Sequence, residues 1–170
     1  MGLEYGLLIV RLALGLAIAA HGAQKLFGWF GGYGIAGTGG FFESLGFRPG
    51  KLFAAAAGSS EFFGGILIVL GLFGGVGPML VLSTMLVAML TVHVKNGFWA
   101  TNNGIEVPFI YATGAVAIAF ASFGAISLDA WLGLALTSKP AIVWGLLALG
   151  VVGALLMLLV RRAPLPQQQT

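Results

Sequence analysis

The chain contains no cysteine. This absence excludes disulfides, thiolate nucleophiles, Cys-ligated iron–sulfur clusters and dithiol relays, so electrons for any redox chemistry would have to come from a partner. Charged residues are also scarce, at 8% of 170 residues, whereas about a quarter of the residues in a soluble domain are charged. With 59% hydrophobic residues and a mean hydropathy of +1.03, this composition predicts an integral membrane protein.

Acidic residues number only 5 in the whole chain, and they form no cluster that would suit a hard metal ion. The formal net charge is +3 and the pI is about 9.6, values that would suggest a nucleic-acid partner if the protein were soluble. In a membrane protein, an excess of basic residues is better explained by the positive-inside rule. We therefore expect the lipid bilayer, and no nucleic acid, as a partner.

Five apolar segments are long enough to cross a bilayer core of about 30 Å, which takes about 20 helical residues. They cover approximately residues 3–27, 52–72, 76–94, 107–123 and 141–160. The fold class predicted from them is an all-α membrane protein: an antiparallel four-helix transmembrane bundle plus one accessory C-terminal transmembrane helix. Residues 1–125 would form the four-helix domain, residues 126–162 a loop and the fifth helix, and residues 163–170 a flexible tail.

The first apolar segment lacks a basic region before it and is interrupted by Arg11, so we expect a retained helix and not a signal peptide. Pro78 and Pro108 mark the starts of the third and fourth helices, because first-turn amides need no helical partner. The glycine-rich and aromatic run 25–32 is too broken for a continuous helix and predicts membrane-surface structure, and 28–51 is the one long connection. Glycines within the apolar segments favour close helix packing and would permit a homo-oligomer.

Five crossings place the two termini on opposite faces of the membrane. One face then collects six basic residues and the other has only Lys139. The six are Lys25, Arg48, Lys51, Lys95, Arg161 and Arg162. By the positive-inside rule, a multi-pass protein of the plasma (cytoplasmic) membrane would have its C-terminus and the connection 28–51 in the cytoplasm.

Two charged residues, Arg11 and Glu61, lie deep within the apolar segments and away from their ends. Counting about 1.5 Å per helical residue places Arg11 and Glu61 both near mid-membrane on antiparallel helices. Intramembrane charges usually pair or face a cavity, so we predict an ion pair between Arg11 and Glu61. Such a pair could fix only the helix register, or it could contact a ligand or transfer protons.

The polar side chains His21, Lys25 and His93 are predicted to lie at one membrane face. Because His21 and Lys25 are four residues apart, they share one side of a helix. Imidazoles could bind a polar headgroup, pass protons or ligate a metal, although a capping or interfacial hydrogen bond explains each histidine equally well. Methionines preceding His93 are typical of helix packing, so neither a soft-metal site nor a haem held by His21 and His93 is favoured, and no metal site is predicted.

A series of short motifs carries a family resemblance. In order, they are Arg11 with Gly15, HGAQKLFG at 21–28, GGFFESLGF at 39–47, Glu61 with Gly64 and Gly65, and HVKNGF at 93–98. Over about residues 1–125 this series resembles the DoxX family. The resemblance implies a small four-helix membrane protein, some of whose relatives are subunits of a thiosulfate:quinone oxidoreductase or belong to membrane-associated oxidoreductase complexes. The fifth helix and polar tail depart from that four-helix pattern.

The resemblance and the polar residues together predict an integral membrane component of an oxidoreductase system that binds quinone or a similar lipid-soluble ligand near one membrane face. His21 and Lys25 would hydrogen-bond the quinone carbonyls, and a reduced quinone would be protonated through His21, His93 or Glu61. Aromatic rings would pack on the quinone ring; the candidates are Phe27, Trp29 and Phe98. Electrons would come from a soluble redox partner.

A second interpretation is a non-catalytic lipid-binding or assembly protein that recruits a soluble partner through its loops. A third is a transporter, although no internal repeat supports alternating access. Whether the chain is an enzyme stays open.

Overall fold

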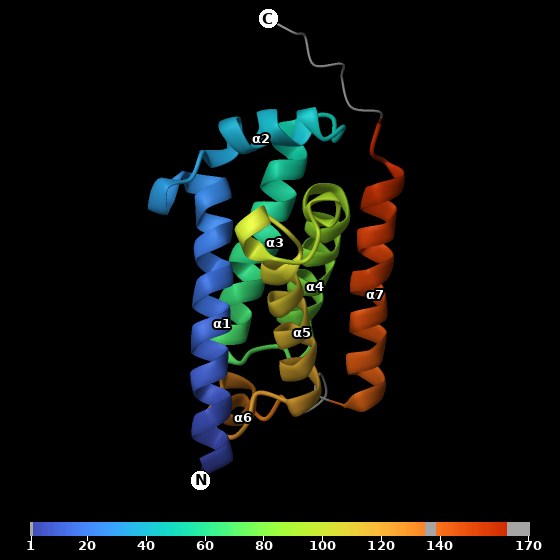
Figure 1. The fold of residues 1–170 in the computed structure, drawn as a ribbon. Coiled ribbons are helices and arrows are strands. Elements are labelled where there is room, and N and C mark those ends of the chain that lie inside the picture. The colour runs from blue at the N-terminus through green and yellow to red at the C-terminus, as the bar shows by residue number, and fades with distance from the viewer. Residues whose placement is uncertain (1, 135–138, 163–170) are drawn as a thin grey trace, which may run out of the picture.

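The computed structural model describes residues 2–134 and 139–162, and the predicted tail 163–170 lies outside them. The described part is all-α without strands, as predicted. Among the described residues, five of the helices run along one bundle axis (Figure 1). They are α1 (Gly2–Phe27), α3 (Gly50–Leu70), α4 (Val76–Ala88), α5 (Glu106–Ala121) and α7 (Pro140–Leu159). Two shorter helices, α2 (Gly34–Ser44) and α6 (Leu128–Leu132), lie at opposite ends of the bundle.

Helix boundaries follow the local residues. Helix α3 ends at Gly71, whose φ of 64° is left-handed and costs glycine little. Pro78 and Pro108 both lie in the first turns of α4 and α5, which confirms the predicted helix starts. Pro140 likewise begins α7 at a position where a missing amide hydrogen is harmless.

Four helices among the described residues are long and apolar enough to cross a membrane: α1, α3, α7 and the segment Val76–Asn96 that begins with α4. Helix α5 has only 16 residues and would rise about 24 Å, less than the roughly 30 Å of a bilayer core. It still runs alongside α4 toward the α6 end of the bundle (Figure 1). The predicted fourth span is therefore an apolar helix shorter than the others.

The connection between α1 and α3, expected as one long loop, contains a helix beyond the broken run 25–32. After a 3₁₀ turn at Trp29–Gly31, α2 crosses the end of the bundle (Figure 1). Its four glycines disfavour a helix, but α2 packs on α3, with Gly39 against Lys51. Tertiary contact thus stabilises a helix that the composition does not predict.

Glycines set the register between α1 and α3, the most extensively packed helix pair. A Cβ added to Gly15 would lie 2.7 Å from the carbonyl oxygen of Gly65, and one added to Gly22 would lie 2.6 Å from that of Gly58. The two backbones touch at these points, as small residues permit in membranes. Arg11 therefore faces the end of α3, near residue 69, and not its middle.

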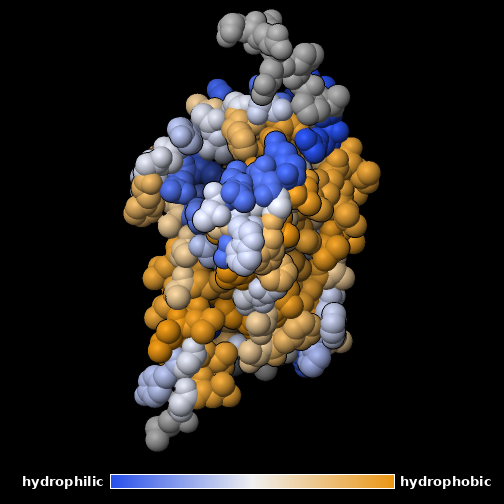
Figure 2. Space-filling model, viewed as in Figure 1, coloured by the Kyte–Doolittle hydropathy of each residue, from blue (hydrophilic) through white to orange (hydrophobic). Residues whose placement is uncertain are grey.

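Helix α7 packs on α4, and its Val143 and Leu147 belong to the same apolar core as Ile18, Ile68 and Val81. The fifth helix therefore shares the bundle's core. On the face that Figure 2 shows, apolar side chains cover the length of the bundle, whereas polar ones gather toward the α2 end. This band of apolar surface is what a bilayer-embedded protein requires.

Candidate functional site

A cavity of about 260 Å³ lies between α1, α3, α4 and the start of α5, toward the α2 end of the bundle. It collects three of the predicted ligand-binding residues, His21, Lys25 and His93, together with Glu61. The remaining lining is mostly apolar or main chain: Met85, Ala88, Ala100, Asn103, Gly104, Val107, Pro108 and Tyr111. Polar groups from separate helices thus converge on one small space.

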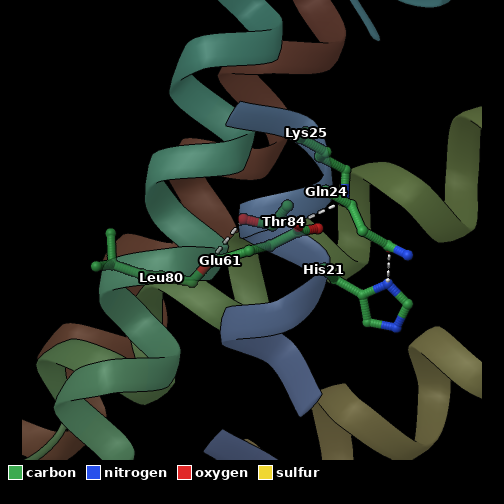
Figure 3. A network of polar contacts seen from close by, with 6 residues as sticks. All are labelled: His21, Gln24, Lys25, Glu61, Leu80 and Thr84. Atoms are coloured by element: carbon green, nitrogen blue, oxygen red, sulfur yellow. Dashed lines mark hydrogen bonds and ion pairs between the residues drawn. The ribbon is translucent and has the colours of Figure 1, made fainter. Parts of the chain in front are cut away.

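Glu61 is the buried charge of this site, with 3% of its side chain exposed. Its Oε2 accepts a hydrogen bond from Nζ of Lys25, whose side chain is 26% exposed (Figure 3). The lysine neutralises a carboxylate that would be costly to bury alone. No second hydrogen bond to Glu61 is found among residues 2–134 and 139–162.

The predicted ion pair between Arg11 and Glu61 is wrong. Arg11 lies at the other end of the bundle and donates to four main-chain carbonyls, those of Ile68, Val69, Phe123 and Ile126, at 2.6–3.0 Å. The register of α1 on α3 separates the two charges by about seven residues of α3, or roughly 10 Å. Counting depth from both helix ends failed because the ends of α1 and α3 are not level.

Arg11 serves instead as a cap for helix ends. Its guanidinium donates to carbonyls in the last turn of α3 and just after α5, a region where main-chain oxygens lack the full set of helical partners, and it lies 5.3 Å from the Phe123 ring centroid. Asp129 completes this region by accepting hydrogen bonds from the amides of Phe73 and Gly74. These contacts hold the loops at the α6 end and assign Arg11 a structural role.

Hydrogen bonds fix the orientation of His21. The amide of Gln24 donates from Nε2 to the Phe30 carbonyl at 3.2 Å, so its Oε1 faces Nδ1 of His21 at 3.1 Å (Figure 3). Because an amide oxygen only accepts, Nδ1 carries the hydrogen in the neutral imidazole. The other nitrogen, Nε2, is then an acceptor without a partner in the described chain.

His93 is held in the same manner. Its Nδ1 lies 2.8 Å from the carbonyl oxygen of Asn103, which can only accept, so Nε2 is again the acceptor of the neutral ring. His93 ends a π-helical turn at Met89–His93, the point where α4 stops being α-helical. Such turns rotate the side chains that follow and are frequent at functional sites.

Tyr111 is the site residue that sequence reasoning missed. Its ring meets His21 edge-on at a centroid distance of 5.7 Å, and its hydroxyl has no hydrogen-bond partner in the described chain. A tyrosine in the largely apolar α5, one helical turn after the lining residue Val107, was the available signal. Tyr111 adds an O–H donor to the cavity.

The three aromatic candidates do not line this cavity. Phe27 and Trp29 pack on one another at 4.9 Å, and each is about half exposed. Phe98 packs on Trp99 at 5.2 Å, in the turn-rich segment before α5. The surfaces available to a flat ring are those of Met85, Ala88 and Val107 instead.

Lys25 also lines a second, larger cavity of about 540 Å³ beneath α2, where its neighbours include Gln24, Tyr33 and Thr38. The ion pair with Glu61 therefore stands between two spaces, one inside the bundle and one at its end. Among residues 2–134 and 139–162, no three His, Asp or Glu side chains are grouped closely enough to hold a metal ion.

Comparison with known proteins identifies one relationship. The family model described as DoxX matches residues 6–94, a stretch that contains His21, Lys25, Glu61 and His93 and ends before Tyr111. No curated protein and no solved structure matches the chain.

Proposed function

Because the chain belongs to the DoxX family of membrane proteins, often linked to oxidoreductase function, we propose that it binds a quinone in the cavity that Glu61 and Tyr111 line. The observation that carries the proposal is the convergence of two imidazoles, an ion pair and a hydroxyl on a space of about 260 Å³. This volume is near the lower end of the range for ligand pockets, so it suits a ring and leaves an isoprenoid tail in the bilayer.

The tautomers of the histidines decide what each can do. With Nδ1 donating to Gln24 or Asn103, a neutral His21 or His93 presents Nε2 as an acceptor, which suits a hydroquinone hydroxyl. When protonated, the same nitrogen becomes a donor that binds a quinone carbonyl and can pass its proton to it. Tyr111 donates its O–H in either state.

A bound quinone supplies two-electron chemistry coupled to protons. The residues of this chain would position the ring and hold the protons, while a soluble redox partner at the α2 end would supply electrons. Lys25 borders both the inner cavity and the larger one beneath α2, and it can exchange protons between Glu61 and the end of the bundle.

A binding titration tests the proposal. A short-chain quinone titrated into the purified full chain by calorimetry should bind wild type, and Tyr111→Phe should weaken binding about tenfold, the value of one buried hydrogen bond. The double variant His21→Ala, Lys25→Ala should abolish binding. Tyr5→Phe removes the same hydroxyl from an exposed position far along α1 and should change nothing.

Unchanged affinity in the His21, Lys25 double variant would exclude this cavity. If wild type binds no quinone but co-purifies with a stoichiometric lipid, the alternative of a non-catalytic lipid-binding or assembly protein takes its place.

The orientation in the membrane is part of the same proposal. The basic residues predicted to share a face do gather at the α2 end, where Arg161 and Arg162 bond to the carbonyls of Leu45 and Gly46. We place this end in the cytoplasm of a plasma-membrane protein. Because the chain has no cysteine, single Gly40→Cys and Gly6→Cys variants can be labelled with an impermeant maleimide in intact cells; only the second should react.

A further inference from the structure

A third cavity, of about 200 Å³, lies between α3, α4 and α7 and shares no lining residue with the cavity that Glu61 lines. Helix α7 packs on α4, which leaves a lateral space between α3 and α7 at the α2 end of the bundle. The walls come from Ala57 and Ser60 of α3, Thr84 of α4, and Gly153 and Met157 of α7. The space is narrow and mostly apolar, and it lies within the membrane-spanning part of the bundle. It therefore suits a hydrocarbon chain.

Three phenylalanine rings close the end of the cavity nearest α2. Phe42 packs on Phe47 at a centroid distance of 5.9 Å, and Phe47 packs on Phe53 at 5.3 Å. Phe47 is 3% exposed, so the ring at the centre of this row is buried. The rings mark the boundary between the apolar cavity and the polar end of the molecule.

Arg48 directly follows Phe47 at this boundary. Its Nε and Nη2 are buried and have no hydrogen-bond partner in the described chain. Arg48 as a whole is only partly buried, but two buried guanidinium nitrogens without an acceptor are still costly, and phosphate oxygens are acceptors that arginine binds in a bidentate manner. Glu43, whose Oε1 accepts from the Gly50 amide at 3.0 Å, forms no hydrogen bond or ion pair with these two nitrogens in the described chain.

Further positive charge surrounds this position. Arg161 donates to the Leu45 carbonyl and Arg162 bonds through its amide to Gly46, so the end of α7 is tied to the segment that carries Arg48. Lys51 lies three residues further along. Four basic residues against the single Glu43 favour an anionic ligand over a zwitterionic one.

We propose that this cavity holds an acyl chain of an anionic membrane phospholipid whose phosphate is bound by Arg48. Phe47 lines the apolar slot and the next residue, Arg48, carries the unpaired guanidinium nitrogens, so one short segment brings together what a lipid's chain and its phosphate need. The site is separate from the quinone cavity and does not depend on it.

Two variants test the two halves of the site. Gly153→Leu fills the slot, since a Cβ at this position lies 3.5 Å from Ser83 Oγ and points toward the lining. Arg48→Gln removes the phosphate ligand. The matched controls are Gly145→Leu on the same helix, where an added Cβ meets nothing within 4 Å, and Lys95→Gln, which removes an exposed charge from the same end.

The measurement is native mass spectrometry of the full chain in detergent with dioleoyl phosphatidylglycerol or phosphatidylcholine. Wild type and both controls should retain one phosphatidylglycerol and prefer it about tenfold, a ratio that one charge-assisted hydrogen bond supplies. Arg48→Gln should lose the preference, and Gly153→Leu should lose retention of both lipids. If Gly153→Leu does not fold, the slot is tested instead with dihexanoyl phosphatidylglycerol, a short-chain lipid that wild type should retain poorly.

Equal retention of both lipids by wild type would overturn the proposal. Retention of dihexanoyl phosphatidylglycerol equal to that of the dioleoyl lipid would also overturn it. So would displacement of the bound lipid by millimolar inorganic phosphate, because either result means that no acyl chain is held.

Discussion

The ion pair between Lys25 and Glu61 gives a sharp energetic prediction. In Lys25→Met, a carboxylate with only 3% of its side chain exposed loses its partner, which costs about 3–5 kcal/mol for a buried pair, less whatever protonation of Glu61 recovers. Glu61→Gln leaves behind a lysine that is 26% exposed and can turn toward the cavity, so its cost should be smaller, about 1 kcal/mol. The double variant should recover much of the loss, with a coupling energy of about 1–3 kcal/mol.

The assay is unfolding in mixed micelles with increasing SDS, followed by tryptophan fluorescence, for the two single variants and the double variant. The control cycle combines Arg11→Met with Glu61→Gln. Because the α3 residues that Arg11 contacts lie roughly 10 Å along the helix from Glu61, the effects of the two substitutions on stability should add within about 0.5 kcal/mol. A large coupling in the Arg11 cycle, or none in the Lys25 cycle, would refute the observed register and favour the pair that depth counting predicts.

Two further predictions concern the bundle itself. Arg11→Met removes all four hydrogen bonds to main-chain carbonyls and should destabilise the protein by about 3–5 kcal/mol in the same unfolding assay, while the calorimetric quinone affinity stays unchanged. Loss of quinone binding with unchanged stability would contradict the capping role. Gly22→Ala places a Cβ 2.6 Å from the Gly58 carbonyl oxygen and should lower the free energy of unfolding by about 1–3 kcal/mol. In the control Gly6→Ala, the added Cβ meets nothing within 4 Å, so the change should be neutral or slightly stabilising. Equal effects at the two glycines would mean that α1 and α3 do not pack as described.

Composition and apolar segment length were sufficient to predict the long helices, because the membrane imposes both length and polarity on a spanning segment. The family resemblance is confirmed over residues 6–94. His21, Lys25 and His93 could be placed at one end of the bundle from their positions near helix ends, and all three line one cavity. Their role as ligands of a quinone stays a prediction.

The features that the sequence did not predict depend on contacts between helices. The partner of Glu61 is decided by the glycine contacts that set the register of α1 on α3, and no single-helix pattern contains that offset. Helix α2 forms because it packs on α3 in spite of its glycines. Tyr111 becomes a site residue only because the short α5 begins level with the π turn that carries His93.

Photo-crosslinking is the most direct test of the central claim, that a quinone ring binds between His21, His93 and Tyr111. An azidoquinone illuminated with the full chain in lipid vesicles, followed by peptide mass spectrometry, should label the segments 85–93 and 104–111 that line the cavity. Excess unlabelled quinone should prevent the labelling, and His21→Ala, Lys25→Ala should reduce it. Labelling confined to the cavity beneath α2, or spread evenly over the lipid-facing helices, would contradict the account.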